Sequence, residues 1–293
     1  MKCLRILLSV VLFGVIVSAV PAVSINASAQ SYIKKGMEYE RYGEIKKAAR
    51  MYEKAVKADP RSYYAHQRLG SAYRAFDKPK KALRSYEKAV SLAPEDPNGL
   101  FYLGRMQWEM GNVAQAKKTL AKAVEVDPGR VDSMVLLAVI KKNEGDVEEA
   151  VRLLQKAIKV DPNSFAAHVN LGNILIERAL WDDALKEFRE AVRIDPHQPE
   201  SRRNLGLVYM RLGKLELAIK HLTAAINMDP QYAIAYYNLA EAYELKKLNG
   251  QAVWYYRKYI ETSEAETDSK WRLMANERIT ELEAAGFAAD VPK

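Results

Sequence analysis

The sequence predicts an all-α fold: a solenoid of about seven helix-turn-helix repeats, closed by a carboxy-terminal capping helix. Three observations support this prediction. A proline returns every 34 residues without insertion or deletion, which is the signature of stacked repeats. Apolar residues within each interval lie three, four and seven positions apart, the spacing of one face of a helix. Small residues return at the same interval. The six prolines are Pro60, Pro94, Pro128, Pro162, Pro196 and Pro230.

Each repeat is predicted to hold two amphipathic helices joined by a polar turn, which often contains glycine. Asp precedes the repeat proline in five of the six copies, and Ala93 is the exception. Proline pushes the residue before it out of the α-helical region, so this dipeptide should end the second helix. The chain then divides into a leader at 1–29, seven repeats within 30–266, a capping helix at 267–286 and a tail at 287–293. The repeats are 29–62, 63–96, 97–130, 131–164, 165–198, 199–232 and 233–266.

Two columns of small residues allow the helices to approach closely. One position of every first helix is Gly or Ala, and one position of every second helix is Ala. The first column is Gly36, Gly70, Gly104, Ala138, Gly172, Gly206 and Ala240, and the second is Ala48, Ala82, Ala116, Ala150, Ala184, Ala218 and Ala252.

This pattern resembles the tetratricopeptide repeat, and the resemblance covers residues 31 to about 266. It implies a right-handed superhelix whose first helices line a concave groove for a ligand. In bacteria the chain resembles exported, periplasmic members of the family that serve pilus, outer-membrane or polysaccharide export machinery.

The last repeat departs from the pattern. Glu264 replaces the expected proline, and a helical stretch follows from about Asp268 to Ala285. A solenoid must cover its terminal apolar face, so this stretch should be a capping helix. Five aromatic residues either fill the joint beneath it or form a homodimer surface, and the sequence leaves both open. They are Trp254, Tyr255, Tyr256, Tyr259 and Trp271.

The first 29 residues have the pattern of a secretory signal peptide. Lys2 and Arg5 precede an apolar run over 6–20, and Ala27-Ser28-Ala29 supplies small residues for cleavage after Ala29. The only cysteine, Cys3, lies in this leader. We expect an exported, periplasmic protein; an uncleaved signal anchor is the alternative.

The positive charge is concentrated in the first two repeats. Residues 29–96 hold 16 Lys and Arg against 9 Asp and Glu, a net charge of +7, whereas the chain from residue 97 onward carries −1. This basic surface is either an ordinary solvated face or a site for an anionic surface, such as lipid head groups or a cell-wall polymer. We expect no nucleic-acid partner, because the chain has no nucleic-acid-binding module. The candidate residues are Lys46, Lys47, Lys80 and Lys81.

Asparagine forms a column on the side that the resemblance assigns to the groove. Asn170, Asn204 and Asn238 are 34 residues apart, and Asn173 lies one turn beyond the first. A primary amide carries two donors and an acceptor, so it can pair with a peptide backbone whatever its side chains are. The alternative is that these residues are solvated or stabilise the repeat.

Apolar residues mark the middle of the expected groove. They predict a dock for an amphipathic helix or a hydrophobic peptide segment, unless they pack against neighbouring repeats instead. The apolar residues are Phe101, Trp108, Val135, Val139, Val169 and Ile176, rimmed by Arg105, Lys142 and Arg203.

No arrangement of catalytic or metal-binding residues is apparent. The four histidines include no pair with the i, i+4 spacing of a metal site, and no phosphate loop or nucleophile motif is present. We therefore expect no cofactor and no metal, and a non-enzymatic adaptor of the cell envelope that binds a peptide or helix for assembly or secretion. The alternatives are a surface-binding module that uses the first two repeats, with peripheral membrane association, and a scaffold that self-associates through the carboxy-terminal joint.

Overall fold

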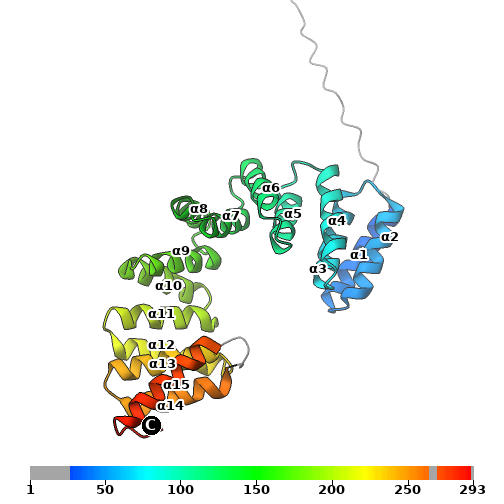
Figure 1. Cartoon of the computed structure of the whole chain (residues 1–293). Coiled ribbons are helices and arrows are strands. Elements are labelled where there is room, and N and C mark those ends of the chain that lie inside the picture. Colours follow the sequence, from blue (N-terminus) through cyan, green and yellow to red (C-terminus); the bar gives the residue numbers. More distant parts are fainter. Residues whose placement is uncertain (1–26, 264–268, 292–293) are drawn as a thin grey trace, which may run out of the picture. The chain divides into compact units, whose positions relative to one another are not determined.

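The computed structural model describes residues 27–263 and 269–291, and over these it consists of fifteen helices without a strand (Figure 1). The predicted all-α class is confirmed. Most of the predicted leader, with Lys2, Cys3 and Arg5, and the substituted position Glu264 lie outside the described residues. The first described helix begins at Ala27, before the predicted cleavage point. Within the described ranges, no helix is both long and apolar enough to cross a membrane.

The described residues divide into two compact units, one ending at Ser85 and one beginning at Tyr86, with the boundary inside α4. In the first unit, α1 packs on α2 and α2 on α3. In the second, each odd-numbered helix from α5 to α13 pairs with the helix that follows it, and each pair packs on the next. The helices are α1 (Ala27–Arg41), α2 (Ile45–Ala58), α3 (Tyr63–Ala75), α4 (Pro79–Leu92), α5 (Pro97–Glu109), α6 (Val113–Val126), α7 (Val131–Asn143), α8 (Val147–Val160), α9 (Phe165–Glu177), α10 (Trp181–Ile194), α11 (Pro199–Arg211), α12 (Leu215–Met228), α13 (Ala233–Leu245), α14 (Asn249–Thr262) and α15 (Ser269–Ala284).

The aspartate side chain of the Asp-Pro dipeptide stabilises the turn between repeats. In all five copies the Asp Oδ1 accepts a hydrogen bond from the backbone N–H two residues later, as in Asp161 with Asn163 at 2.9 Å. This bond closes an Asx turn, which explains the aspartate as well as the proline.

A side chain from the next helix secures the same turn in four copies. The residue six positions after the proline reaches the proline carbonyl oxygen, at 3.1–3.3 Å. The pairs are His66 with Pro60, His168 with Pro162, Arg202 with Pro196, and Tyr236 with Pro230. His168 also lies 2.7 Å from the Glu187 carboxylate, so this buried histidine has a structural role.

The turn inside each hairpin places one residue in the left-handed region, again every 34 residues. Four copies use glycine there: Gly43, Gly111, Gly145 and Gly213. Three use a residue with a Cβ, which costs energy in this conformation: Asp77 (φ +51°), Ala179 (φ +56°) and Lys247 (φ +65°).

The small column of the first helices receives a large side chain from the paired helix. A Cβ on Gly172 would lie 2.8 Å from the Phe188 ring, and one on Gly206 would lie 2.7 Å from Leu222. Such distances are too short for a real contact, so these positions need glycine for packing.

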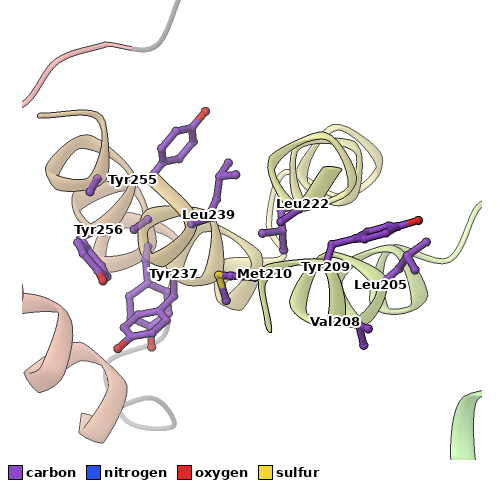
Figure 2. Close-up of a cluster of buried hydrophobic side chains, with 14 of the residues drawn as sticks. Leu205, Val208, Tyr209, Met210, Leu222, Tyr237, Leu239, Tyr255 and Tyr256 are labelled. Atoms are coloured by element: carbon purple, nitrogen blue, oxygen red, sulfur yellow. The ribbon is translucent and has the colours of Figure 1, made fainter. Parts of the chain in front are cut away.

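Figure 2 shows part of the carboxy-terminal core, including Tyr237, Leu239 and Tyr256. Helix α15 closes this core and contributes Ala275 and Leu282 to it. Arg272 of α15 donates to the backbone oxygens of Ile260 and Ser263, satisfying carbonyl groups at the end of α14. The ring of Tyr237 meets Tyr256, Tyr259 and Trp271 edge-on at 5.0–5.4 Å between centroids.

The aromatic residues of this joint therefore serve mainly as core. Tyr255, Tyr256 and Tyr259 are buried, whereas Trp271 keeps 42% of its surface exposed. The following segment folds back, with the Asp290 N–H donating to Gly250 at 2.9 Å.

Candidate protein-binding surface

The candidate site lies on the first helices of the second unit, α5, α7, α9, α11 and α13, which we call the first-helix layer. Contacts join α5 to α7, α7 to α9, and α11 to α13. A hydrogen bond between Asn173 and Asn204 joins α9 to α11. Residues 34 apart therefore occupy equivalent places on successive members of one layer.

The asparagine column belongs to a hydrogen-bond network within the chain. Asn204 and Asn238 are 3% and 4% exposed. The Asn204 amide donates to Asn173 Oδ1 at 3.0 Å, and the Asn238 amide donates to Glu241 Oε2 at 3.2 Å. Asn170 donates to Ala166 of its own helix. Asn170 and Asn173 are more exposed than Asn204 and Asn238, so their amides are more accessible for hydrogen bonds to a ligand.

Arg203, expected at the rim of an apolar stripe, instead links this network. Its Nε donates to Asn238 Oδ1 at 2.8 Å and its Nη1 to Asn204 Oδ1 at 2.9 Å. The chain of bonds thus runs from α9 through α11 to Glu241 on α13. Burial raises the pKa of Glu241, although Asn238, Arg211 and Arg203 favour its charged form.

The amino-terminal part of the layer holds the apolar residues at different depths. Phe101 and Val135 are buried in the core. The guanidinium carbons of Arg105 and Arg130 each lie 5.3 Å from the centroid of the Phe101 ring, which gives it cation–π partners.

Four predicted apolar residues stay partly accessible on this part of the layer. They are Trp108, Val139, Val169 and Ile176. Beside them Lys142 of α7 donates to Glu177 of α9 at 2.5 Å. The predicted stripe is therefore narrower than expected and crossed by an ion pair.

The predicted basic residues are exposed in the first unit. Lys46 lies 5.1 Å from the centroid of the Phe76 ring, and Lys81 lies 5.3 Å from that of Tyr73. Lys47 pairs with Glu44 at 2.7 Å. A cavity of about 460 Å³ lies beside Phe76 and Lys46.

A cavity of about 420 Å³ between α11, α13, α14 and α15 was not predicted. Its wall carries four carboxylates: Glu241, Glu244, Glu277 and Glu281. The 34-residue spacing could have indicated two of them, since Glu241 continues the column of Val139 and Glu244 that of Trp108. The others come from α15, outside the repeat. Among the described residues, no group of three or more His, Cys, Asp or Glu is placed to hold a metal ion.

Family models match most of the repeat region. One model described as tetratricopeptide repeat matches residues 73–137 and 143–203, a second matches 33–99, and a TPR repeat model matches 208–247. A search of curated proteins found no match.

Solved structures with the same fold include three of different lengths. A chain of the APC/C hetero-tetramer Cut9-Hcn1 aligns with a TM-score of 0.66 and 20% identity over 73% of this chain and 43% of that one. Pseudomonas aeruginosa pilF aligns with a TM-score of 0.63 and 18% identity over 69% and 92%. A tetratricopeptide repeat protein from Parabacteroides merdae gives 0.62 and 16% over 87% and 99%.

Identities this low show a shared fold alone. Proteins with this fold generally act as non-enzymatic scaffolds for protein–protein interactions. The matched family models, the helical hairpins and the 34-residue period lead to one conclusion: this chain belongs to the tetratricopeptide repeat family.

Proposed function

We propose that this protein is a non-enzymatic adaptor that binds an amphipathic helix or peptide segment of a partner protein on the first-helix layer. The observation that carries the proposal is the strip of half-buried apolar side chains on successive first helices, Val139, Val169 and Ile176, beside the amide of Asn173. Apolar side chains that keep part of their surface accessible favour association, although Ile176 also packs against the carboxy-terminal core. The neighbouring amide can fix the backbone or a polar side chain of the partner.

The spacing of the layer favours a helix as the occupant. Helices in contact lie about 8–10 Å apart, so equivalent side chains such as Val139 on α7 and Asn173 on α9 recur at roughly that interval. Residues seven apart on one face of an α-helix recur about every 10.5 Å. Same-face residues of a strand recur about every 6.6 Å. A helix with one apolar side chain every second turn therefore matches the layer better than a strand.

We also propose that the protein acts in the cell envelope, in assembly or secretion. Support comes from the charged, apolar and small-residue regions of its leader and from the absence of cysteine after that leader in the sequence. Processing after Ala29, or retention as an anchor, can be tested by amino-terminal sequencing of the protein isolated from membrane and soluble fractions.

The adaptor proposal is tested by cross-linking and capture from the native envelope. Val139→Asp with Val169→Asp should remove the captured partner, because two carboxylates would have to be buried against an apolar face. The matched control reverses charge at Lys46, Lys47, Lys80 and Lys81 and should leave capture intact. Unchanged capture by the valine variant, with its helical content preserved, would refute the proposal.

The basic face of the first unit supports a second candidate function, binding to an anionic surface. Lys46, Lys80 and Lys81 are exposed, and Lys46 and Lys47 line the cavity beside Phe76. Sedimentation with vesicles that contain anionic lipid should then decline with salt and be lost in the four-lysine variant. Binding by that variant equal to wild type would exclude this candidate.

A further inference from the structure

We propose that the cavity between α11, α13, α14 and α15 binds the cationic side chain of an arginine or lysine in the partner segment. This inference deepens the proposed function, since the cavity lies at the carboxy-terminal end of the first-helix layer. It names the chemistry of one anchor residue of the partner.

The lining suits a long cationic side chain, and the cavity has ample room for one. The cavity measures about 420 Å³, and Tyr237, Tyr256, Met210 and Met274 give it an apolar and aromatic part. Such a lining accommodates the methylene stem of lysine or arginine. Aromatic rings and carboxylates both attract the charged end of these side chains.

Two of the four glutamates lie outside the Arg278 ion pairs, and of these Glu241 is half-buried whereas Glu277 is exposed. Of the four glutamates, Glu244 and Glu281 both pair with Arg278, and Glu244 also accepts from the Tyr256 hydroxyl at 3.2 Å. Glu241 has the Asn238 amide as its hydrogen-bond donor. Arg211 and Arg203 both lie close enough to influence Glu241, but Arg211 is exposed, as is Lys247, and Arg203 donates its hydrogen bonds to Asn204 and Asn238.

Glu241 is also held in position. Its partner Asn238 is buried and is itself fixed by Arg203 at 2.8 Å. A carboxylate oriented by a buried amide has its second oxygen in a defined place. A guanidinium or ammonium that enters the cavity can therefore gain a charge-assisted hydrogen bond without reorganising the wall.

Nuclear magnetic resonance of methyl-labelled methionine tests the proposal, because Met210 and Met274 line the cavity. The probes are N-acetylarginine methylamide, its lysine counterpart, and the citrulline counterpart, which is similar in shape but uncharged. We expect saturable shifts of the Met210 and Met274 methyl signals with the arginine or lysine probe. Binding should be at least about tenfold weaker for citrulline, since a charged hydrogen bond is lost.

Glu241→Gln should weaken binding of the charged probe by about tenfold, while Glu177→Gln on α9, outside the cavity, should not. Equal affinity for the citrulline probe, or equal affinity of the Glu241→Gln and wild-type proteins, would overturn the inference. So would shifts confined to other methionines.

The Val139→Asp, Val169→Asp variant separates this inference from the adaptor proposal. It should still bind the arginine probe, because both valines are outside the cavity. Loss of partner capture with probe binding retained supports both proposals. Partner capture that is insensitive to Glu241→Gln refutes the anchor alone, and capture insensitive to the valine changes refutes the adaptor surface alone.

Discussion

Two parts of the first-helix layer place different chemistry on equivalent positions. From α5 to α9 one column runs through Phe101, Val135 and Val169, whereas on α11 and α13 it continues as Arg203 and Tyr237. The earlier part packs mainly by apolar contact, with two guanidinium groups over the Phe101 ring. The later part is joined by side-chain hydrogen bonds and edge-on rings. The repeat therefore determines which positions of successive first helices are in contact, but not which interactions join them.

The difference has a functional consequence. Polar groups that bond one another in the later part are already satisfied, and a partner gains little by replacing those bonds. Half-buried valines in the earlier part gain when a partner covers them. The layer thus combines an apolar strip with a more rigid, polar end, and the two ends should respond differently to substitution.

The largest effect should come from Tyr237→Ala, which removes the ring at the centre of the carboxy-terminal aromatic cluster. We expect the free energy of unfolding to fall by about 3–5 kcal/mol. Val135→Ala in the same column should cost less, about 2 kcal/mol, since two methyl groups are lost. Urea unfolding followed by circular dichroism and tryptophan fluorescence measures both. If both substitutions lowered the free energy of unfolding equally, the aromatic cluster around Tyr237 would be no more strongly packed than the core around Val135.

Arg203→Ala should produce the second largest effect. It leaves the buried Asn204 and Asn238 oxygens without their donors, at a cost of about 2 kcal/mol or more. Val169→Ala, the matched change one repeat earlier, should cost under about 1 kcal/mol because Val169 is half-buried. Hydrogen exchange should show lost protection around α11 and α13 in the arginine variant only. Arg203→Lys should recover little, because lysine lacks the planar fork that spans both amides.

Substitutions in the hairpin turns should change stability equally in both parts of the layer, because the turn geometry is the same in each. They therefore serve as an internal control for the comparison. Gly145→Ala and Gly213→Ala should each destabilise the protein by about 1 kcal/mol, because each introduces a Cβ at positive φ. Ala179→Gly removes such a Cβ and should stabilise it by roughly 0.5 kcal/mol, the gain being reduced by the greater freedom of glycine in the unfolded chain. The shift of the thermal unfolding midpoint relative to wild type shows whether each variant is stabilised or destabilised. Stabilisation by either glycine-to-alanine change would contradict the assigned turn geometry.

The spacing of the sequence was sufficient to predict the helical hairpins, because periodicity determines which faces are buried. The spacing could not indicate that Ala179 and Lys247 have a positive φ, a conformation usually adopted by glycine. The surrounding repeat imposes this conformation on both residues. The Asp-Pro dipeptide was predicted to end the second helix, but the role of its aspartate as an acceptor for the N–H two residues later depends on the three-dimensional geometry of the turn.

The candidate site was less predictable for a related reason. A 34-residue column identifies equivalent positions but not their depth, so the sequence left open whether Asn204 faces a ligand or stabilises the repeat; the residue is buried in a hydrogen-bond network. Whether an amide meets solvent depends on the size of the side chains around it, here Arg203 and Asn173. The cavity could not be predicted because α15 forms part of its wall, and the position of α15 does not follow from the repeat.

The smallest expected effect concerns pH, where two glutamates with opposite pKa shifts should affect stability with opposite signs. Burial raises the pKa of Glu241 above its ordinary value of 4.5. A carboxyl group with a raised pKa favours the folded state while it is protonated, and this stability is lost as the pH rises through the raised pKa. Glu241→Gln should therefore gain stability relative to wild type between about pH 4 and pH 8, by less than the turn substitutions change it.

Glu148 on α8 provides the opposite case. The Arg178 side chain lowers the pKa of Glu148 by hydrogen bonding to its charged form. That stability is present above the ordinary pKa and is lost as the pH falls, so Glu148→Gln should lose stability relative to wild type near neutral pH. Urea midpoints of the two variants and wild type at pH 5 and pH 8 measure both trends. If the Glu241→Gln difference did not grow with pH, the carboxylate would already be compensated, and the cavity would offer a cation no unbalanced charge.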